Sequence, residues 1–182
     1  MKNIYLVRHC SAYGQHKDSP LTNTGIRQAQ HVSRFFSKQD IKVDKIISSP
    51  YLRAIESIKP FAQKLEMDIE IDVRLHERIL SEEPIDDWLE VLDRSFQEPD
   101  FFLPGGESAN EAVQRANHVL EMIYTDDSIT NVIVVSHGNL LALLLKQHDN
   151  NFGFEQWKAL RSPDVYLLSQ QKGNSKIECV WE

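Results

Sequence analysis

Near its start the chain reads Ile4-Tyr5-Leu6-Val7-Arg8-His9-Cys10-Ser11. The four apolar residues form an unbroken run between polar ones, which is typical of a strand buried on both faces of a parallel sheet. Such a strand delivers Arg8 and His9 to its carboxyl end, where open α/β sheets form their ligand crevices. An arginine beside a histidine at this place can hold an anion and attack it.

Further along, short apolar runs alternate with amphipathic segments, in the manner of an α/β protein. Strands are predicted over residues 44–48, 69–73 and 132–136. His137-Gly138 follows the last of these and is expected to turn the chain into a helix. The strand at 69–73 alternates apolar residues with acids and is expected near an edge. Residues 165–169 and 177–181 are expected to close the sheet as a hairpin that turns at Gly173-Asn174.

Helix signals lie between these strands. Thr22 is the expected cap of a helix to about Lys38, and Ser49-Pro50 predicts the start of a helix to Leu65. Ser108 and Glu111 match a capping box ahead of a helix through Ile123. An apolar helix is expected over residues 140–146.

Residues 81–106 differ in composition, being acidic and punctuated by prolines. Five apolar residues within them recur at helical spacing and predict an inserted helix: Ile85, Trp88, Leu89, Leu92 and Phe96. This stripe could complete the core or belong to a moving lid. The whole pattern predicts one domain over residues 1–182, a three-layer α/β sandwich with a mostly parallel central sheet and a short helical insertion, about residues 80–106, over its carboxyl edge.

Composition limits the partners. The chain of 182 residues holds 20 Lys and Arg against 27 Asp and Glu, a formal charge of -7. This surface argues against nucleic acid or an anionic membrane as a partner, although a small basic pocket for phosphate is compatible with it. No leader or membrane-spanning run is recognisable. Two cysteines, Cys10 and Cys179, are interpreted as reduced thiols in a cytoplasmic protein.

Four polar places converge at the carboxyl edge of the predicted sheet. Arg8-His9 follows the first strand, Arg53 begins the helix after the second, Glu77 follows the third, and His137 follows the strand at 132–136. Each residue alone has a plainer interpretation, as a strand end, a solvated arginine or a surface ion pair. Their convergence on one crevice is what indicates a site.

Three other chemistries fit the sequence poorly. A cysteine phosphatase needs an arginine six positions after its thiolate, and counting from Cys10 that position holds His16. No zinc spacing such as H-E-x-x-H or paired C-x-x-C is present, so no metal site is expected. Gly105-Gly106 lacks the lysine of a P-loop and is interpreted as a tight turn.

The chain resembles the histidine phosphatase superfamily, the phosphoglycerate-mutase-like group. Five ordered motifs carry the resemblance, and together they run from the first strand to the second histidine: Val7-Arg8-His9-Cys10-Ser11, Leu21-Thr22-Asn23-Thr24-Gly25-Ile26-Arg27-Gln28-Ala29, Ser48-Ser49-Pro50-Tyr51-Leu52-Arg53-Ala54, Pro104-Gly105-Gly106-Glu107-Ser108 and Val135-Ser136-His137-Gly138.

The resemblance implies a role for each of the convergent residues. His9 would become phosphorylated, with Glu77 as proton donor and no cofactor required. Arg8, Arg53 and His137 would bind the phosphoryl group. Four further residues are expected to bind the substrate: Ser11, Gln15, Thr22 and Gly138. Phosphoryl transfer asks the protein mainly for positioning and positive charge, which arginine forks supply.

The sequence also departs from the family pattern. Cys10 stands where glycine is usual, Ala12 replaces a hydroxyl residue and Gln15 an asparagine. The tryptophan-and-glycine segment typical of mutases is absent after Glu77, which favours a phosphatase. Few basic residues are expected near the rim (Arg78, Lys17 and Arg94), and the acidic insertion disfavours polyanions.

We therefore expect a metal-independent phosphomonoesterase acting on a small phosphorylated metabolite. A phosphate-binding or regulatory module in which the departures mark lost catalysis, and a phosphatase of phosphoproteins, including phosphohistidine proteins, are open alternatives. A mutase is a third and weaker one.

Overall fold

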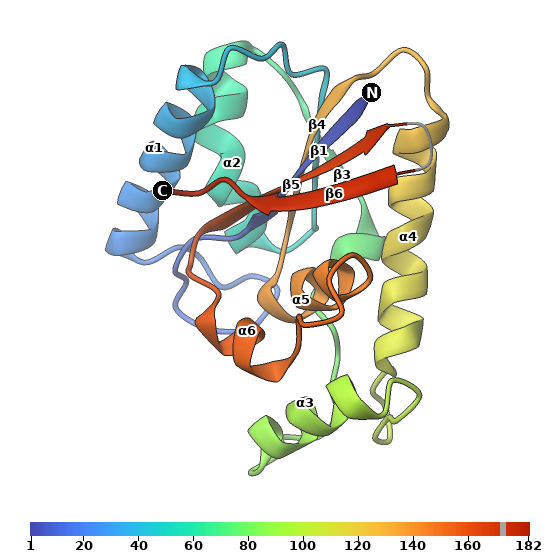
Figure 1. Ribbon diagram of the computed structural model, residues 1–182. Helices are drawn as coiled ribbons and strands as arrows, with labels where there is room; N and C mark the ends of the chain where they lie inside the picture. The colour runs from blue at the N-terminus through green and yellow to red at the C-terminus, as the bar shows by residue number, and fades with distance from the viewer. Residues whose placement is uncertain (172–173) are drawn as a thin grey trace.

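The computed structural model describes residues 1–171 and 174–182 and has an α/β fold built on a six-stranded sheet (Figure 1). The strands lie in the order β3-β2-β4-β1-β5-β6. The first four strands of this order are parallel to one another. At the other edge β5 pairs antiparallel with β1, and β6 pairs antiparallel with β5. The mostly parallel sheet is as predicted, and its strands are β1 (Lys2–Arg8), β2 (Lys45–Ser48), β3 (Ile69–Ile71), β4 (Asn131–Ser136), β5 (Asp164–Gln171) and β6 (Asn174–Cys179).

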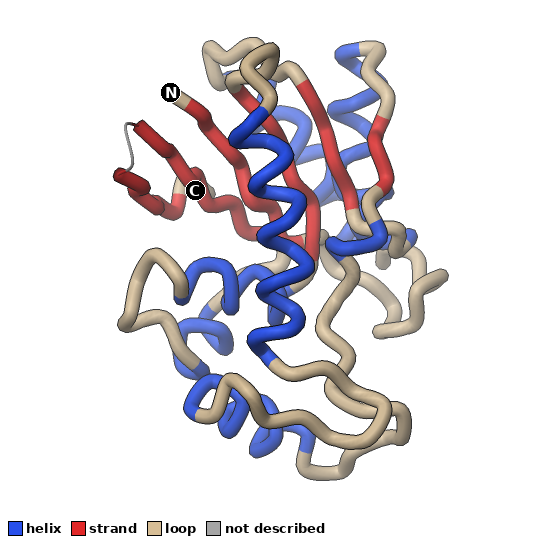
Figure 2. Tube along the Cα trace, turned by 90° about the vertical axis from the view of Figure 1, so that its right-hand side faces the viewer, coloured by secondary structure: helices blue, strands red, loops and turns tan. Residues whose placement is uncertain are grey.

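Helices cover both faces of the sheet, which confirms the three layers. Successive residues of a strand point to opposite faces. In β1, Tyr5 and Val7 therefore pack with α1 and α2, while Ile4 and Leu6 pack with α4 and α5. Figure 2 shows α4 crossing in front of the strands on this second face. The helices on the two faces are α1 (Asn23–Lys38), α2 (Leu52–Leu65), α4 (Ala109–Thr125) and α5 (Gly138–Lys146).

Two predicted caps are present. The Thr22 hydroxyl accepts a hydrogen bond from the Gly25 N–H (3.0 Å) at the start of α1. Ser108 and Glu111 form the reciprocal capping box at the start of α4. Both helices follow from side chains that satisfy N–H groups left free in a first helical turn.

The start of α2 was predicted wrongly. The helix begins at Leu52 rather than Pro50, and its N-cap, Tyr51, makes no side-chain cap. The Ser49 hydroxyl accepts a hydrogen bond from the Tyr51 N–H (3.2 Å), and it also bonds the His137 ring. The sequence pattern predicted that this hydroxyl caps a helix starting at Pro50, whereas in the structure it contacts His137.

Three other predictions need smaller corrections. The strand predicted over 69–73 ends at Ile71, because residues 73–75 form a single 3₁₀ turn, η1 (Val73–Leu75); β3 is nevertheless an edge strand, as expected. The inserted helix α3 (Trp88–Gln97) leaves Ile85 in the preceding loop. β5 and β6 pair as the expected hairpin, although its predicted turn at Gly173-Asn174 lies in part outside the described residues.

One helix was not predicted. α6 (Phe154–Ala159) lies between α5 and β5, and it contacts α3 at the end of the molecule away from the N-terminus (Figure 1). Within the described part of the chain, none of the helices combines the length and the apolarity that crossing a membrane requires. That residues 1–182 form a single domain stays a prediction.

Candidate active site

The carboxyl ends of three adjacent strands bring the central residues together. His9 follows β1 and His137 follows β4, and the two strands are in register so that Arg8 pairs with Ser136. The rings of His9 and His137 therefore lie side by side, with centroids 5.1 Å apart. Ser49 follows β2 on the other side of β4, and its hydroxyl bonds Nε2 of His137 at 2.7 Å. The crevice expected at this sheet edge is thus formed by neighbouring strands.

Two hydrogen bonds fix the protonation of the His9 ring. Nδ1 lies 2.6 Å from the carbonyl oxygen of Cys10, which can only accept, so Nδ1 carries the proton. Arg53 Nε, which can only donate, lies 3.2 Å from Nε2. Burial lowers the pKa of His9 from 6.5 to about 4, and the charges of Arg53 and Arg8 act in the same direction. At neutral pH the ring is uncharged, with its lone pair on Nε2.

This lowered pKa predicts a pH-dependent stability. Between pH 6.5 and about 4 the unfolded chain binds a proton at His9 that the folded chain does not. The free energy of unfolding should therefore fall as the pH drops through this window, by up to roughly 3 kcal/mol from His9 alone. Urea unfolding at several pH values measures this.

The matched comparison uses two variants. His9→Gln should show a shallower fall in unfolding free energy between pH 6.5 and 4, whereas His118→Gln, on the exposed face of α4, should follow the wild type. A slope that is the same in His9→Gln as in wild type would contradict the buried neutral His9.

Two arginines surround this ring. Arg53 is 1 % exposed, and its Nη1 donates to the carbonyl groups of Gln15 (3.1 Å) and His16 (2.9 Å). Arg8 Nη1 donates to the carbonyl of Leu160 at 2.7 Å, while its Nε is buried with no partner among the described residues. Burial lowers the pKa of both guanidinium groups, and the Glu77 carboxylate opposes that shift. Both remain cations at neutral pH.

Gly138 leaves the space that Arg8 occupies. A Cβ atom at this position would lie 2.9 Å from Arg8 Nε and 3.0 Å from its Cζ. We expect Gly138→Ala to displace the guanidinium and lower turnover on the order of 10²-fold, since a misplacement of about 1 Å has this effect in active sites. The melting temperature should change little, because the atoms that move end a flexible side chain. Steady-state kinetics with thermal melts measures both.

Gly153→Ala is the control for that substitution. Its added Cβ would meet only Gln156 Oε1, at 3.7 Å. Unchanged turnover in Gly138→Ala would mean that the position of Arg8 does not matter for the reaction.

His137 is fully buried at the N-cap of α5. Burial is the main cause that lowers its pKa well below the usual value, so the ring is neutral. Ser49 accepts from the Tyr51 N–H and can donate its own proton to Nε2. The ring proton then lies on Nδ1, a buried atom with no hydrogen-bond partner in the described residues.

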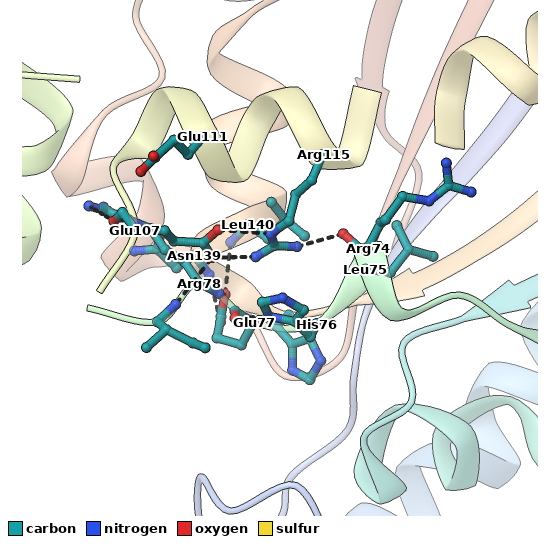
Figure 3. Close-up of polar contacts among 12 residues, drawn as sticks. Arg74, Leu75, His76, Glu77, Arg78, Glu107, Glu111, Arg115, Asn139 and Leu140 are labelled. Carbon is teal, nitrogen blue, oxygen red and sulfur yellow. Dashed lines mark hydrogen bonds and ion pairs between the residues drawn. The ribbon is translucent and has the colours of Figure 1, made fainter. Parts of the chain in front are cut away.

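Glu77 binds the first turn of α5 through its carboxylate (Figure 3). Oε1 accepts from the N–H of Arg78 (2.8 Å) and of Leu140 (3.0 Å), and Oε2 accepts from Asn139 N–H (3.0 Å). Backbone N–H groups at a helix N-terminus are good donors to an anion. They hold this carboxylate in place beside His137.

Hydrogen bonds around the Arg115–Glu107 ion pair fix the segment that carries Glu77 to α4 (Figure 3). Arg115 contacts Glu107 through two hydrogen bonds of 2.6 and 2.9 Å, and it also donates to the carbonyl of Arg74. Arg78, 5 % exposed, donates Nε and Nη2 to the Glu107 carbonyl, both at 3.1 Å. Its Nη1 has no partner among the described residues.

A cavity of about 640 Å³ opens over these residues. One part of its lining is polar and contains Arg8, His9, Arg53, Glu77 and Asn139. Buried polar groups are normally paired, yet four side chains of the site hold buried polar atoms without a partner in the described chain. Arg8, Arg78 and Asn139 line the cavity, whereas the fully buried His137 is not among its lining residues. The unpaired atoms of Arg8, Arg78 and His137 can only donate in the protonation states derived above, and the Asn139 amide has one donor and one acceptor. The arrangement therefore suits an anion.

The further predicted residues divide into two groups. Gln15 and Gly138 line the cavity. Ser11 and Thr22 do not: Thr22 caps α1 and donates to the Ser11 carbonyl, and Ser11 N–H donates to Gln28. These two residues hold the loop after β1, and their prediction as substrate contacts has no geometric support.

The other predicted positions can be assigned as well. The Cys10 side chain is fully buried in the core beneath α2, where burial raises the pKa of the thiol to about 11. Of the basic residues expected at the rim, Arg78 lines the cavity; Lys17 and Arg94 do not, and Arg94 pairs with Glu98.

Several site residues were not predicted. Ser49 was interpreted as a helix cap, and Asn139, Tyr51 and Trp157 were not singled out. Asn139 follows His137-Gly138 directly, so its proximity to a predicted site was a signal. Trp157 carried none, because it reaches the cavity from the unpredicted helix α6.

Comparison with known proteins shows the family of the chain. A family model described as histidine phosphatase superfamily (branch 1) matches residues 4–178. The chain belongs to this superfamily. The residues at the strand ends, from Arg8-His9 to His137-Gly138, therefore lie within a family match that covers nearly the whole chain, which supports an enzyme of the phosphatase or mutase type.

Relatives of the chain carry names of both types. It is 31 % identical over 159 residues to "Putative phosphoserine phosphatase 2" of Hydrogenobacter thermophilus, covering 78 % of this chain and 75 % of that protein. It is 32 % identical over 164 residues to "Probable phosphoglycerate mutase GpmB" of Proteus mirabilis, covering 80 % and 74 %. The structure of a mycobacterial glucosyl-3-phosphoglycerate phosphatase has the same fold, with a TM-score of 0.77, 20 % identity and 98 % coverage of both chains.

Proposed function

We propose that this histidine phosphatase superfamily member hydrolyses phosphomonoesters of small metabolites through a phosphohistidine at His9, without a metal ion. The observation that carries the proposal is the state of the His9 ring. Its proton is held on Nδ1 by the Cys10 carbonyl, and its lone pair lies on Nε2 beside Arg53. A neutral imidazole in this orientation, bordering an anion-binding cavity, is suited to nucleophilic attack.

In the first step Nε2 of His9 attacks phosphorus, and the bond from phosphorus to the ester oxygen breaks. Arg8 and Arg53 supply positive charge to the equatorial oxygens, and the Nδ1–H of His137 supplies a further donor. Glu77 gives a proton to the departing alkoxide. The step requires Glu77 to carry this proton when the substrate binds.

In the second step water attacks the phosphohistidine. Glu77, now ionised, takes a proton from the water, and the bond between phosphorus and Nε2 breaks. Inorganic phosphate leaves and both residues return to their first state. A mutase would instead return the phosphoryl group to an organic acceptor; the short acidic insertion supports hydrolysis, because its carboxylates disfavour retention of a bisphosphate.

The test is hydrolysis of p-nitrophenyl phosphate by the wild-type protein in EDTA, together with mass spectrometry of protein that is quenched in alkaline denaturant during turnover, because the P–N bond of a phosphohistidine is labile in acid. We expect turnover that EDTA leaves unchanged, and a phosphoryl adduct on the peptide that contains His9. Phosphate binding without turnover would contradict the hydrolase and favour a binding module. Turnover only after addition of an organic phosphoryl acceptor would favour a mutase.

A further inference from the structure

The cavity over His9 has an apolar side that the chemistry of phosphate does not require. Six residues form it: Ile79, Leu80, Ile85, Trp88, Leu92 and Trp157. They come from the segment after Glu77, from the insertion with α3, and from α6. This side is continuous with the polar part, since one cavity contains both.

Two tryptophans dominate the apolar side. Trp88 of α3 and Trp157 of α6 meet edge to face, with ring centroids 6.0 Å apart and planes at 88°. Trp157 also stacks on Phe154, at 5.5 Å and 22°. Edge-to-face pairs are a favoured geometry of aromatic rings, so the two indoles support one another in place. Yet Trp88 remains 45 % exposed, which leaves much of its surface for a ligand.

From this juxtaposition we propose that the enzyme prefers phosphomonoesters whose alcohol carries an apolar ring, held against Trp88 and Trp157 while the phosphate lies at His9. The inference rests on the proposed function and specifies its substrate class. A volume of about 640 Å³ holds more than a phosphate group and falls within the range of small-molecule sites, roughly 300–1,000 Å³.

Charge at the cavity argues in the same direction. Glu83 contributes a carboxylate to the lining, and the insertion around it is acidic. Among the described lining residues, Arg78 is the one cation apart from Arg8 and Arg53. Its Nε and Nη2 bind the Glu107 carbonyl and its Nη1 is unpaired, while three carboxylates lie near it: Glu77, Glu107 and Glu111. A second anionic group on the substrate would meet more negative than positive charge there.

The proposal differs from what the names of the relatives suggest. Phosphoserine and phosphoglycerate are small, strongly polar and carry a carboxylate. Neither would use a surface of two tryptophans and four aliphatic side chains. The decisive test therefore compares the hydrolysis of a phosphomonoester that carries an apolar ring with that of one that carries a carboxylate.

The experiment compares kcat/KM for benzyl phosphate, ethyl phosphate and phosphoserine. Benzyl and ethyl phosphate release alcohols of similar acidity, so their difference reports binding of the ring. We expect benzyl phosphate to exceed both others by about tenfold, the size of effect that aromatic packing supplies. Trp88→Ala should remove most of this advantage and leave ethyl phosphate unchanged, with Trp157→Ala as the second variant.

Phe102→Ala is the matched control, because Phe102 is an exposed aromatic residue of the insertion (62 %) outside the cavity lining. The Phe102→Ala variant should keep the full difference in kcat/KM between benzyl phosphate and ethyl phosphate. Preference for phosphoserine, or an advantage of benzyl phosphate that survives both tryptophan variants, would overturn the proposal. Equal turnover of benzyl and ethyl phosphate would overturn it and leave the hydrolase intact.

If no ester is hydrolysed, the proposed function fails and binding decides the inference. Calorimetry with benzylphosphonate and ethylphosphonate, which cannot be hydrolysed, then supports the aromatic surface if the ring gives tighter binding that Trp88→Ala removes. Equal affinity for the two phosphonates would overturn it.

Discussion

His9→Ala should lower the hydrolysis of p-nitrophenyl phosphate in EDTA by at least about 10⁴-fold and abolish the phosphoryl adduct. Removal of a catalytic nucleophile has effects of this order or larger, because the remaining groups cannot form the covalent intermediate. The assay measures initial rates at neutral pH, where the wild-type His9 ring is uncharged.

The control is His118→Ala, which changes an exposed histidine of α4 and should keep wild-type rates. Circular dichroism should show that both variants are folded. Arg8 and Arg53 remain in His9→Ala, so inorganic phosphate should still bind and can be measured by calorimetry. Turnover by His9→Ala at a rate near that of the wild type would mean that another group is the nucleophile.

Glu77→Gln is expected to have the second largest effect. The amide keeps the size of the side chain but cannot give the leaving group a proton, and general acid catalysis is worth roughly 10²- to 10⁴-fold. The loss should be large for ethyl phosphate, whose alkoxide needs that proton, and much smaller for p-nitrophenyl phosphate, whose phenolate leaves without it. Comparison of the two substrates measures this directly.

This difference separates a proton donor from a residue that only holds the site in shape. Glu77 also accepts three backbone hydrogen bonds, and the amide would place an N–H₂ group among these donors, at a cost of about 1–3 kcal/mol in stability. An equal loss on both substrates would therefore contradict the role as acid. Glu83→Gln, another carboxylate of the cavity lining, is the control and should show neither effect.

Much of the fold was predictable because its signals are local. The apolar runs that end in Arg8-His9 and His137-Gly138 predicted two central parallel strands, and the structure pairs them in register. The capping box of Ser108 and Glu111 needs only residues within one turn, and it is present. Histidines that follow neighbouring strands must meet at one edge of the sheet, so the centre of the site followed from the strand prediction.

The errors arose where a distant partner decides the outcome. The Ser49 hydroxyl bonds His137, which follows another strand, and α2 starts later than its proline suggests. Thr22 bonds α1 and the loop after β1, and its predicted contact with substrate stays a prediction. Trp88 and Trp157 meet only after α3 and α6 have packed together, and no spacing in the sequence indicates that contact.

The burial of α5 differs from that of the insertion, and this difference decides which of the two can change during evolution. Every residue from Gly138 to Leu145 is buried, so the position of His137 at its N-terminus is set by the hydrophobic core. Changes in α5 would alter folding and catalysis together and would rarely survive selection. Trp88, by contrast, is 45 % exposed and Ile85 is only partly buried, although Leu92 and Phe96 anchor the same insertion in that core. New substrate preferences can therefore evolve in the insertion while the phosphoryl-transfer chemistry is inherited unchanged.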